Sequence, residues 1–331
     1  PSTVNRQPDI GRLLAFAYPD RIAQARGGGG RYLLANGSGA VLPTAQSLSR
    51  SEFLVVAELT AADREAVIRL AAPIERAAIE SDFASRIEHR QRLEWDSRER
   101  AVLAREEWWL GAIKLSERRV DEPDSERLSS ALIEGIRELG IAVLPWTKEA
   151  RSLQQRMTFA RSIDQRVGQA WPDVTDAALT AALEQWLAPS LAGMSRIDHL
   201  ARLDLAAILT AMLPWSERQR LDEIAPTHVR VPSGSRIPID YSQAPPTIAV
   251  RLQEVFGLRA TPAIGGGKVP LTLHLLSPAH RPVQVTKDLA SFWARGYAEV
   301  RKELKGRYPK HYWPDDPLTA EATARAKPRG R

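Results

Sequence analysis

The sequence predicts an α+β protein of several domains, in which a small β-barrel is followed by a helical segment and a mixed α/β C-terminal region. Short runs that alternate apolar and polar residues fill positions 30–116, helical spacing dominates from about 125 to 213, and alternation returns from about 228. The 331 residues are enough for two or three domains.

Residues 1–27 are predicted to contain a helix followed by a linker. Leu13, Leu14 and Phe16 have helical spacing, which Pro19 then interrupts. The four glycines at 27–30 are typical of a flexible connection.

Residues 28–120 are predicted to form the barrel. Asn36-Gly37 is a hairpin signal, since both central positions of such a turn need a positive φ. Residues 87–95 alternate as a half-buried strand does. Six or seven short strands in this range favour a small closed barrel.

Residues 121–215 are predicted to be helical and residues 216–317 to be mixed β and α. Thr175 is a plausible helix N-cap, and Asp288 is expected to begin a last amphipathic helix with a basic end. The polar residues 318–331 are predicted to be a disordered basic tail.

The sequence contains no residue pattern that predicts catalysis, a cofactor or a metal. The chain has no Cys, which excludes disulfides and Cys-based metal sites. Its six His form no close pair, and the glycines at 265–267 lack the spacing and the hydroxyl residue of a phosphate-binding loop. Its longest uncharged apolar run, residues 205–216, is too short to cross a bilayer, so a soluble, cytoplasmic protein is expected.

Positive charge is concentrated at the C-terminal end. Residues 281–331 hold 12 Lys and Arg against 6 Asp and Glu, whereas residues 1–280 hold 34 of each kind. In the run KGRYPKHYW at 305–313, cations alternate with aromatic residues, a composition suited to phosphates and stacked bases. Packing of these aromatics against the domain explains the same pattern equally well.

Long segments resemble the C-terminal part of bacterial HrpB-type DEAH-box helicases. The strongest similarity lies in PVQVTKDLASFW at 282–293 and VRKELKGRYPKHYWPDDP at 300–317, and residues 14–24, 30–37, 233–241, 250–257 and 273–278 resemble the family as well. The resemblance implies a domain order of two RecA-like motor domains, a winged helix, a helical bundle, an OB-like barrel and a C-terminal extension.

On this resemblance, the helix within residues 1–27 is the end of a helical-bundle domain, residues 28–120 are the OB-like barrel and residues 121–331 the extension. The motor domains, with the ATP and Mg that the full-length parent needs, are expected to precede Pro1. This chain is therefore expected to have no ATPase activity and no cofactor of its own, although the parent couples ATP hydrolysis to movement along RNA.

The expected function is an accessory one, in which the chain binds single-stranded RNA and braces the motor domains. The candidate RNA-binding residues are Arg301, Lys302, Lys305, Arg307, Tyr308, Lys310, Tyr312 and Trp313 at the C-terminal end, with Arg31, Tyr32, Arg90 and Arg92 on the predicted barrel. The alternative is a scaffold that contacts the motor or another protein without binding RNA. An independent enzyme with a non-standard site has no residue pattern in its favour.

Overall fold

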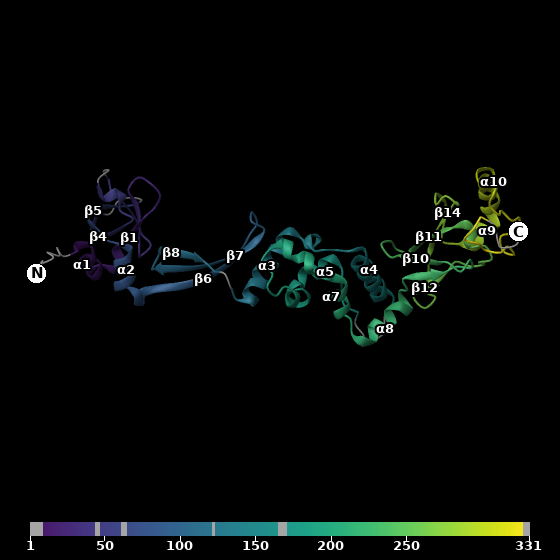
Figure 1. Ribbon diagram of the computed structural model, residues 1–331, viewed down its shortest axis with the longest axis horizontal. Helices are drawn as coiled ribbons and strands as arrows, with labels where there is room; N and C mark the ends of the chain where they lie inside the picture. Colours follow the sequence, from purple (N-terminus) through teal and green to yellow (C-terminus); the bar gives the residue numbers. More distant parts are fainter. Residues whose placement is uncertain (1–8, 44–46, 61–64, 121–122, 165–170, 327–331) are drawn as a thin grey trace, which may run out of the picture. The chain divides into compact units, whose positions relative to one another are not determined.

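The computed structural model describes residues 9–43, 47–60, 65–120, 123–164 and 171–326. The chain divides into two compact units (Figure 1). The first contains residues 1–135 with 193–196, and the second contains residues 136–192 with 197–331. No helix among the described residues has both the length and the apolar character needed to span a membrane.

A closed five-stranded barrel forms the N-terminal part of the first unit. Around the barrel the strands follow the order β1-β2-β3-β5-β4, and β1 closes it by pairing with β4. The pair of β3 and β5 is parallel, and the other pairs are antiparallel. The bounds are β1 Ile22–Ala25, β2 Arg31–Leu34, β3 Gly39–Val41, β4 Phe53–Thr60 and β5 Ala66–Pro73.

Alternation along β4 builds two apolar clusters. Leu54 and Val56 point into the barrel, whereas Phe53 and Val55 belong to a second cluster outside it. That second cluster includes Ala15 of α1 (Ile10–Ala17) and Ile79 of α2 (Arg76–Asp82). The barrel is therefore covered by apolar neighbours on one side of β4.

The structure divides residues 1–120 differently from the sequence prediction. Strand β1 lies in the segment assigned to a linker, because the helix ends at Ala17 and a short 3-10 turn at Pro19–Arg21 leads directly into an extended segment. The last three predicted barrel strands form a separate antiparallel sheet in the order β6-β7-β8. These are β6 Ile87–Asp96, β7 Ala101–Leu110 and β8 Ile113–Arg119, which follow a 3-10 turn at Ala84–Arg86.

The helical region begins with α3 (Ser125–Leu139), whose first eleven residues belong to the first unit. The helices that follow in the second unit are α4 Lys148–Ile163, α5 Asp176–Ala181, α6 Leu183–Trp186, α7 Leu205–Ala211 and α8 Trp215–Ile224. The predicted N-cap is confirmed, since Thr175 accepts a hydrogen bond from the backbone N–H of Ala178.

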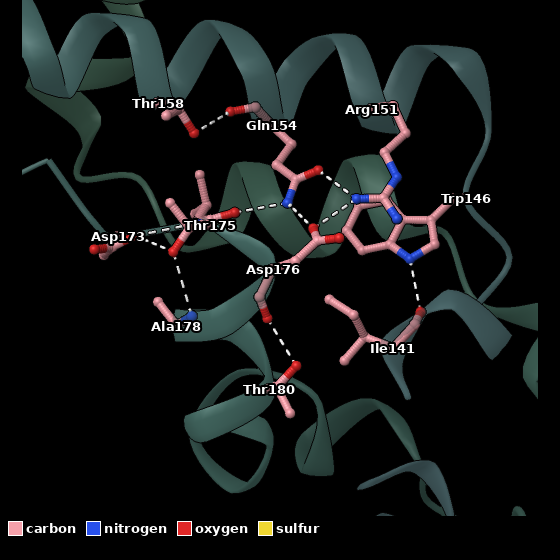
Figure 2. A network of polar contacts seen from close by, with 11 residues as sticks. Ile141, Trp146, Arg151, Gln154, Thr158, Asp173, Thr175, Asp176, Ala178 and Thr180 are labelled. Carbon is pink, nitrogen blue, oxygen red and sulfur yellow. Dashed lines mark hydrogen bonds and ion pairs between the residues drawn. The ribbon is translucent and has the colours of Figure 1, made fainter. Parts of the chain in front are cut away.

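A polar network joins α4 to the start of α5 (Figure 2). Arg151 donates to both Gln154 and Asp176, and the Gln154 amide donates to Asp176 at 2.7 Å. The Arg151 guanidinium also lies 3.7 Å from the centre of the Trp146 ring. The carboxylate of Asp176 thus compensates the positive charge of Arg151 in this network.

The C-terminal part of the second unit is a mixed sheet in the order β15-β14-β11-β10-β9. Strands β11 and β14 are parallel, and their side chains Ile248, Val250, Leu273 and Leu275 are buried. The bounds are β9 His228–Arg230, β10 Arg236–Asp240, β11 Thr247–Arg251, β14 Thr272–Leu276 and β15 Pro282–Thr286. A small hairpin, β12 Ala263–Ile264 with β13 Val269–Pro270, surrounds the glycines at 265–267, which all have positive φ and form its turn.

The predicted last helix is two helices. Asp288 caps α9 (Leu289–Arg295) as expected, and α10 (Tyr297–Arg307) begins after Gly296. Phe256, Trp293 and Tyr297 pack ring against ring between these helices and the sheet.

Residues 318–326 also differ from the prediction, because they are attached to the body of the unit. Thr323 N–H donates to Gln253 O at 3.0 Å, and Arg251 donates to Ala324 O at 2.9 Å. Backbone groups satisfied in this way fix a segment that composition alone marks as disordered. Residues 327–331 of the predicted tail lie outside the described residues.

The buried carboxylate of Glu254 accepts hydrogen bonds from Ser235 and Arg251, and these bonds should make the stability of the second unit depend on pH. Burial alone raises the pKa of Glu254, but hydrogen bonds from Ser235 and Arg251 outweigh it and hold the pKa below its ordinary value. The carboxylate therefore adds stability above the unfolded pKa of about 4.5, and that stability is lost as the pH falls through the lowered folded pKa.

We expect Glu254→Gln to cost about 1.5–3 kcal/mol in the free energy of unfolding at pH 7, since these hydrogen bonds involve charge. Urea unfolding between pH 3 and pH 7 measures the difference from the unmodified chain. The difference should shrink below pH 4.5, and a constant difference over the whole range would contradict the assignment.

Candidate nucleic-acid interface

The C-terminal end of α10 presents a group of exposed cations. Lys302, Lys305, Arg307 and Lys310 are all exposed, while Leu304 of the same helix is buried. Among the described residues, the one ion pair in this group joins Arg307 to Glu303 at 3.2 Å, one helical turn away. An exposed pair of this kind is weak, so the four cations can exchange solvent for phosphate at little cost.

Arg301 belongs to the same helix but has a different position. It is partly buried, its Nε donates to Trp313 O at 3.1 Å, and its Nη2 pairs with Asp315 Oδ1 at 2.5 Å. Arg301 thus ties the segment that follows α10 back to the helix. Its guanidinium is already bonded to Trp313 O and Asp315, so it is less available to a phosphate than the exposed cations are.

The aromatic residues of 308–313 do not all remain available for stacking. Trp313 is 7% exposed and donates its indole N–H to Tyr308 O at 2.9 Å, so here the packing interpretation is correct. Tyr308 and Tyr312 are partly buried, and Tyr312 meets Phe256 edge to face. The chain turns back after Tyr308, and this turn brings the rings over the body of the unit.

Of the two barrel candidates on β2, only Arg31 is exposed. Its Nε lies 3.5 Å from Glu65 Oε2. Tyr32 is 1% exposed within the barrel core, and its hydroxyl donates to Leu48 O and Ser51 O. Alternation along β2 turns the Tyr32 ring inward, so this candidate RNA-binding residue presents no ring for stacking in this structure.

Arg90 and Arg92 lie on the separate sheet and not on the barrel. Arg90 pairs with Glu88 at 2.7 Å and lies over the Trp109 ring at 5.0 Å. Arg92 pairs with Glu94 at 2.5 Å. Both occupy the same face of β6.

The strand register adds two arginines that the sequence analysis missed. Arg92 is directly opposite Arg105 of β7, which is directly opposite Arg119 of β8. Like charges in adjacent cross-strand positions are unfavourable, and Glu94 and Glu117 partly offset them, with Glu117 3.9 Å from Arg105. Alternation could place each arginine on a face, but only the register reveals the row.

The described residues offer no arrangement for metal chemistry. They contain no group of three or more His, Asp or Glu side chains that could hold a metal ion.

Comparisons with known proteins show that this chain is similar to HrpB-type helicases. Residues 186–317 match the family model described as HrpB_C, ATP-dependent helicase C-terminal. The chain is 42% identical over 321 residues to the ATP-dependent RNA helicase HrpB of Escherichia coli K12. The matched region covers 96% of this chain but only 39% of that protein. The chain thus spans about two fifths of the length of this relative.

Two solved structures are also similar. The crystal structure of the E. coli DExH-box NTPase HrpB superposes with a TM-score of 0.60 at 41% identity, over 96% of this chain and 39% of that one. A second crystal structure, of the Escherichia coli DEAH/RHA helicase HrpB, gives a TM-score of 0.52 at 39% identity, over 92% and 38%.

Proposed function

Because residues 186–317 match the HrpB C-terminal model and nearly the whole chain is similar to E. coli HrpB, we propose that this chain is the accessory part of an ATP-dependent RNA helicase. In this proposal the chain binds single-stranded RNA and braces the motor domains of the full-length protein, where ATP and Mg bind. The proposal keeps the cytoplasmic location expected from the sequence.

The observation that carries RNA binding is the set of exposed cations on α10 and just beyond it. Lys302, Lys305, Arg307 and Lys310 face solvent with one weak ion pair among them in the described part of the chain. Cations so placed release counterions from the RNA backbone when they bind it, and this release drives association.

The barrel gives a second line of support. Its order β1-β2-β3-β5-β4, closed by β1 with β4 and containing a parallel β3–β5 pair, fits an OB-type barrel. OB-type barrels bind strands through the β2–β3 face and adjacent loops. Arg31 of β2 is the exposed cation that this geometry would use.

Fluorescence anisotropy with a labelled single-stranded RNA, at several salt concentrations, tests the proposal. Four phosphate contacts predict a slope of about −3 for log K against log salt. The variant K302Q/K305Q/R307Q/K310Q should flatten this slope and raise Kd at least about tenfold at low salt. Arg301 stays unchanged, since it holds Trp313 and Asp315.

A charge-matched control removes four other exposed cations of the second unit: Arg202, Arg230, Arg236 and Lys268. This control should keep most of the salt dependence. If both variants weaken binding equally, the α10 cations have no special role. If the folded chain binds no RNA at low salt, direct recognition is wrong and the scaffold alternative takes its place.

A further inference from the structure

The first unit contains a cavity beside the sheet β6-β7-β8. Its volume is about 480 Å³, and it lies between the α2 region and the sheet. Glu80 and Ala84 line one side, and Ile87, His89, Trp108 and Ser116 line the other. His89, Trp108 and Ser116 are directly opposite one another on the three strands, so together they form a continuous row across the sheet.

This row lies on the face opposite to Arg90 and Arg92. Successive residues of a strand alternate between faces, so His89 and Trp108 share one face while Arg90 and Trp109 share the other. The cavity is therefore separate from the arginine candidates predicted from the sequence.

Two side chains contact the Trp108 ring, and a third joins them to each other. The His89 ring packs on it with centroids 5.1 Å apart, and the Arg118 guanidinium lies 5.9 Å from the ring centre. The carboxylate of Glu106 accepts from Arg118 at 2.7 Å and lies 3.7 Å from His89 Nε2. An indole fixed by its neighbours loses little conformational entropy when a ligand stacks on it.

The indole is fixed but not covered. Trp108 is only partly buried, and the side chains of His89 and Arg118 are 49% and 72% exposed. A large aromatic ring left open to solvent beside a cavity of ligand size is typical of a binding site. The neighbouring guanidinium can reach a phosphate as well as the carboxylate.

We propose that this cavity binds one base of a single-stranded RNA, which stacks on the platform of Trp108 and His89 while Arg118 contacts an adjoining phosphate. This inference rests on the proposed function and adds a base-contacting site far in sequence from α10. Every base has a π face, so the site is tolerant of sequence.

RNA binding by the full 331-residue chain tests the site through three substitutions. Trp108→Leu should raise Kd for a short single strand at least about fivefold, because base–aromatic stacking is lost. Trp108→Phe should keep Kd within about twofold of the unmodified chain, since the ring remains available. Trp109→Leu, on the opposite face, is the matched control and should also stay within about twofold.

Two further measurements separate stacking from folding. An RNA with single abasic positions should bind the unmodified chain more weakly than the intact RNA, and Trp108→Leu should abolish that difference. Ala84→Trp places a bulky side chain at an exposed position that lines the cavity, so it should obstruct the cavity and raise Kd as Trp108→Leu does.

The outcomes distinguish this inference from the proposed function. If the α10 variant weakens binding while Trp108→Leu and Ala84→Trp do not, the base site is wrong and the proposed function stands. If the unmodified chain binds no RNA, both are wrong. If Trp108→Leu also flattens the slope of log K against log salt, the lost contact is electrostatic, and the stacking proposal is wrong.

Discussion

Arg156→Met is expected to lower the free energy of unfolding of the second unit by about 1–3 kcal/mol. Arg156 of α4 is 8% exposed, and its Nε donates to Ala225 O at 2.6 Å. Its guanidinium also pairs with Asp222 of α8. Removal of the cation leaves the buried carbonyl of Ala225 without its donor, and an unsatisfied buried group costs about 1–3 kcal/mol. The Asp222 side chain is 80% exposed, so loss of the ion pair adds only about 0–1 kcal/mol to this cost.

Arg161→Met on the same helix is the matched control. Arg161 pairs with Asp173 at 2.5 Å, but both side chains are more than 40% exposed. Exposed pairs contribute about 0–1 kcal/mol, so the control should change little. Chemical denaturation followed by circular dichroism measures both variants. Equal effects would mean that burial of Arg156 does not determine its contribution.

Gly135→Ala is expected to destabilise the first unit by about 1–3 kcal/mol, although the same change stabilises most helices. A Cβ built at Gly135 of α3 would lie 2.4 Å from the Trp95 ring of β6. The indole therefore packs directly on the helix backbone, and an added methyl must push the sheet and the helix apart. This overpacking outweighs the propensity gain of about 1 kcal/mol that Ala gives in an open helix.

Gly306→Ala in α10 is expected to change the free energy of unfolding in the opposite direction. Nothing lies within 4 Å of a Cβ at Gly306, so this change should stabilise the second unit by about 0.5 kcal/mol. Thermal unfolding of the two variants gives the comparison. A stabilising Gly135→Ala would show that Trp95 does not pack on α3 as described.

Arg156 and Gly135 lie in the packing that supports the two candidate RNA-binding surfaces. Arg156 fixes α4 to α8 within the unit that contains α10. Gly135 and Trp95 fix the β6-β7-β8 sheet that carries Trp108. Loss of RNA binding in either variant at a temperature where it is folded would show that rigidity of the unit matters to binding.

Local signals in the sequence predicted much of the fold. Thr175 and Asp288 cap their helices because their side-chain oxygens reach backbone N–H groups three residues ahead, which is a local property. Gly37 lies in the β2–β3 connection with φ +91, as expected, but Asn36 does not have the positive φ that a two-residue turn requires, because the connection runs from Ala35 to Ser38. The exposed cations of α10 also follow from the sequence, since their positions surround the buried Leu304.

Tertiary structure decided what depends on pairing between distant strands and on which face a side chain occupies. Ile22–Ala25 became a barrel strand because it pairs with β2 and β4, which no pattern of four residues can reveal. Tyr32 and Trp313 look like stacking residues in the sequence but are buried, since their backbones direct the rings inward.

The sequence by itself indicated the similarity to HrpB-type helicases, the mixture of strands and helices and the basic C-terminal end, because these depend on residue identity and short-range spacing. Only the tertiary structure placed Arg105 and Arg119 beside Arg92 and set His89 and Arg118 around Trp108. Those neighbours are brought together by strand register, which is fixed by the packing of the whole unit and not by any local segment.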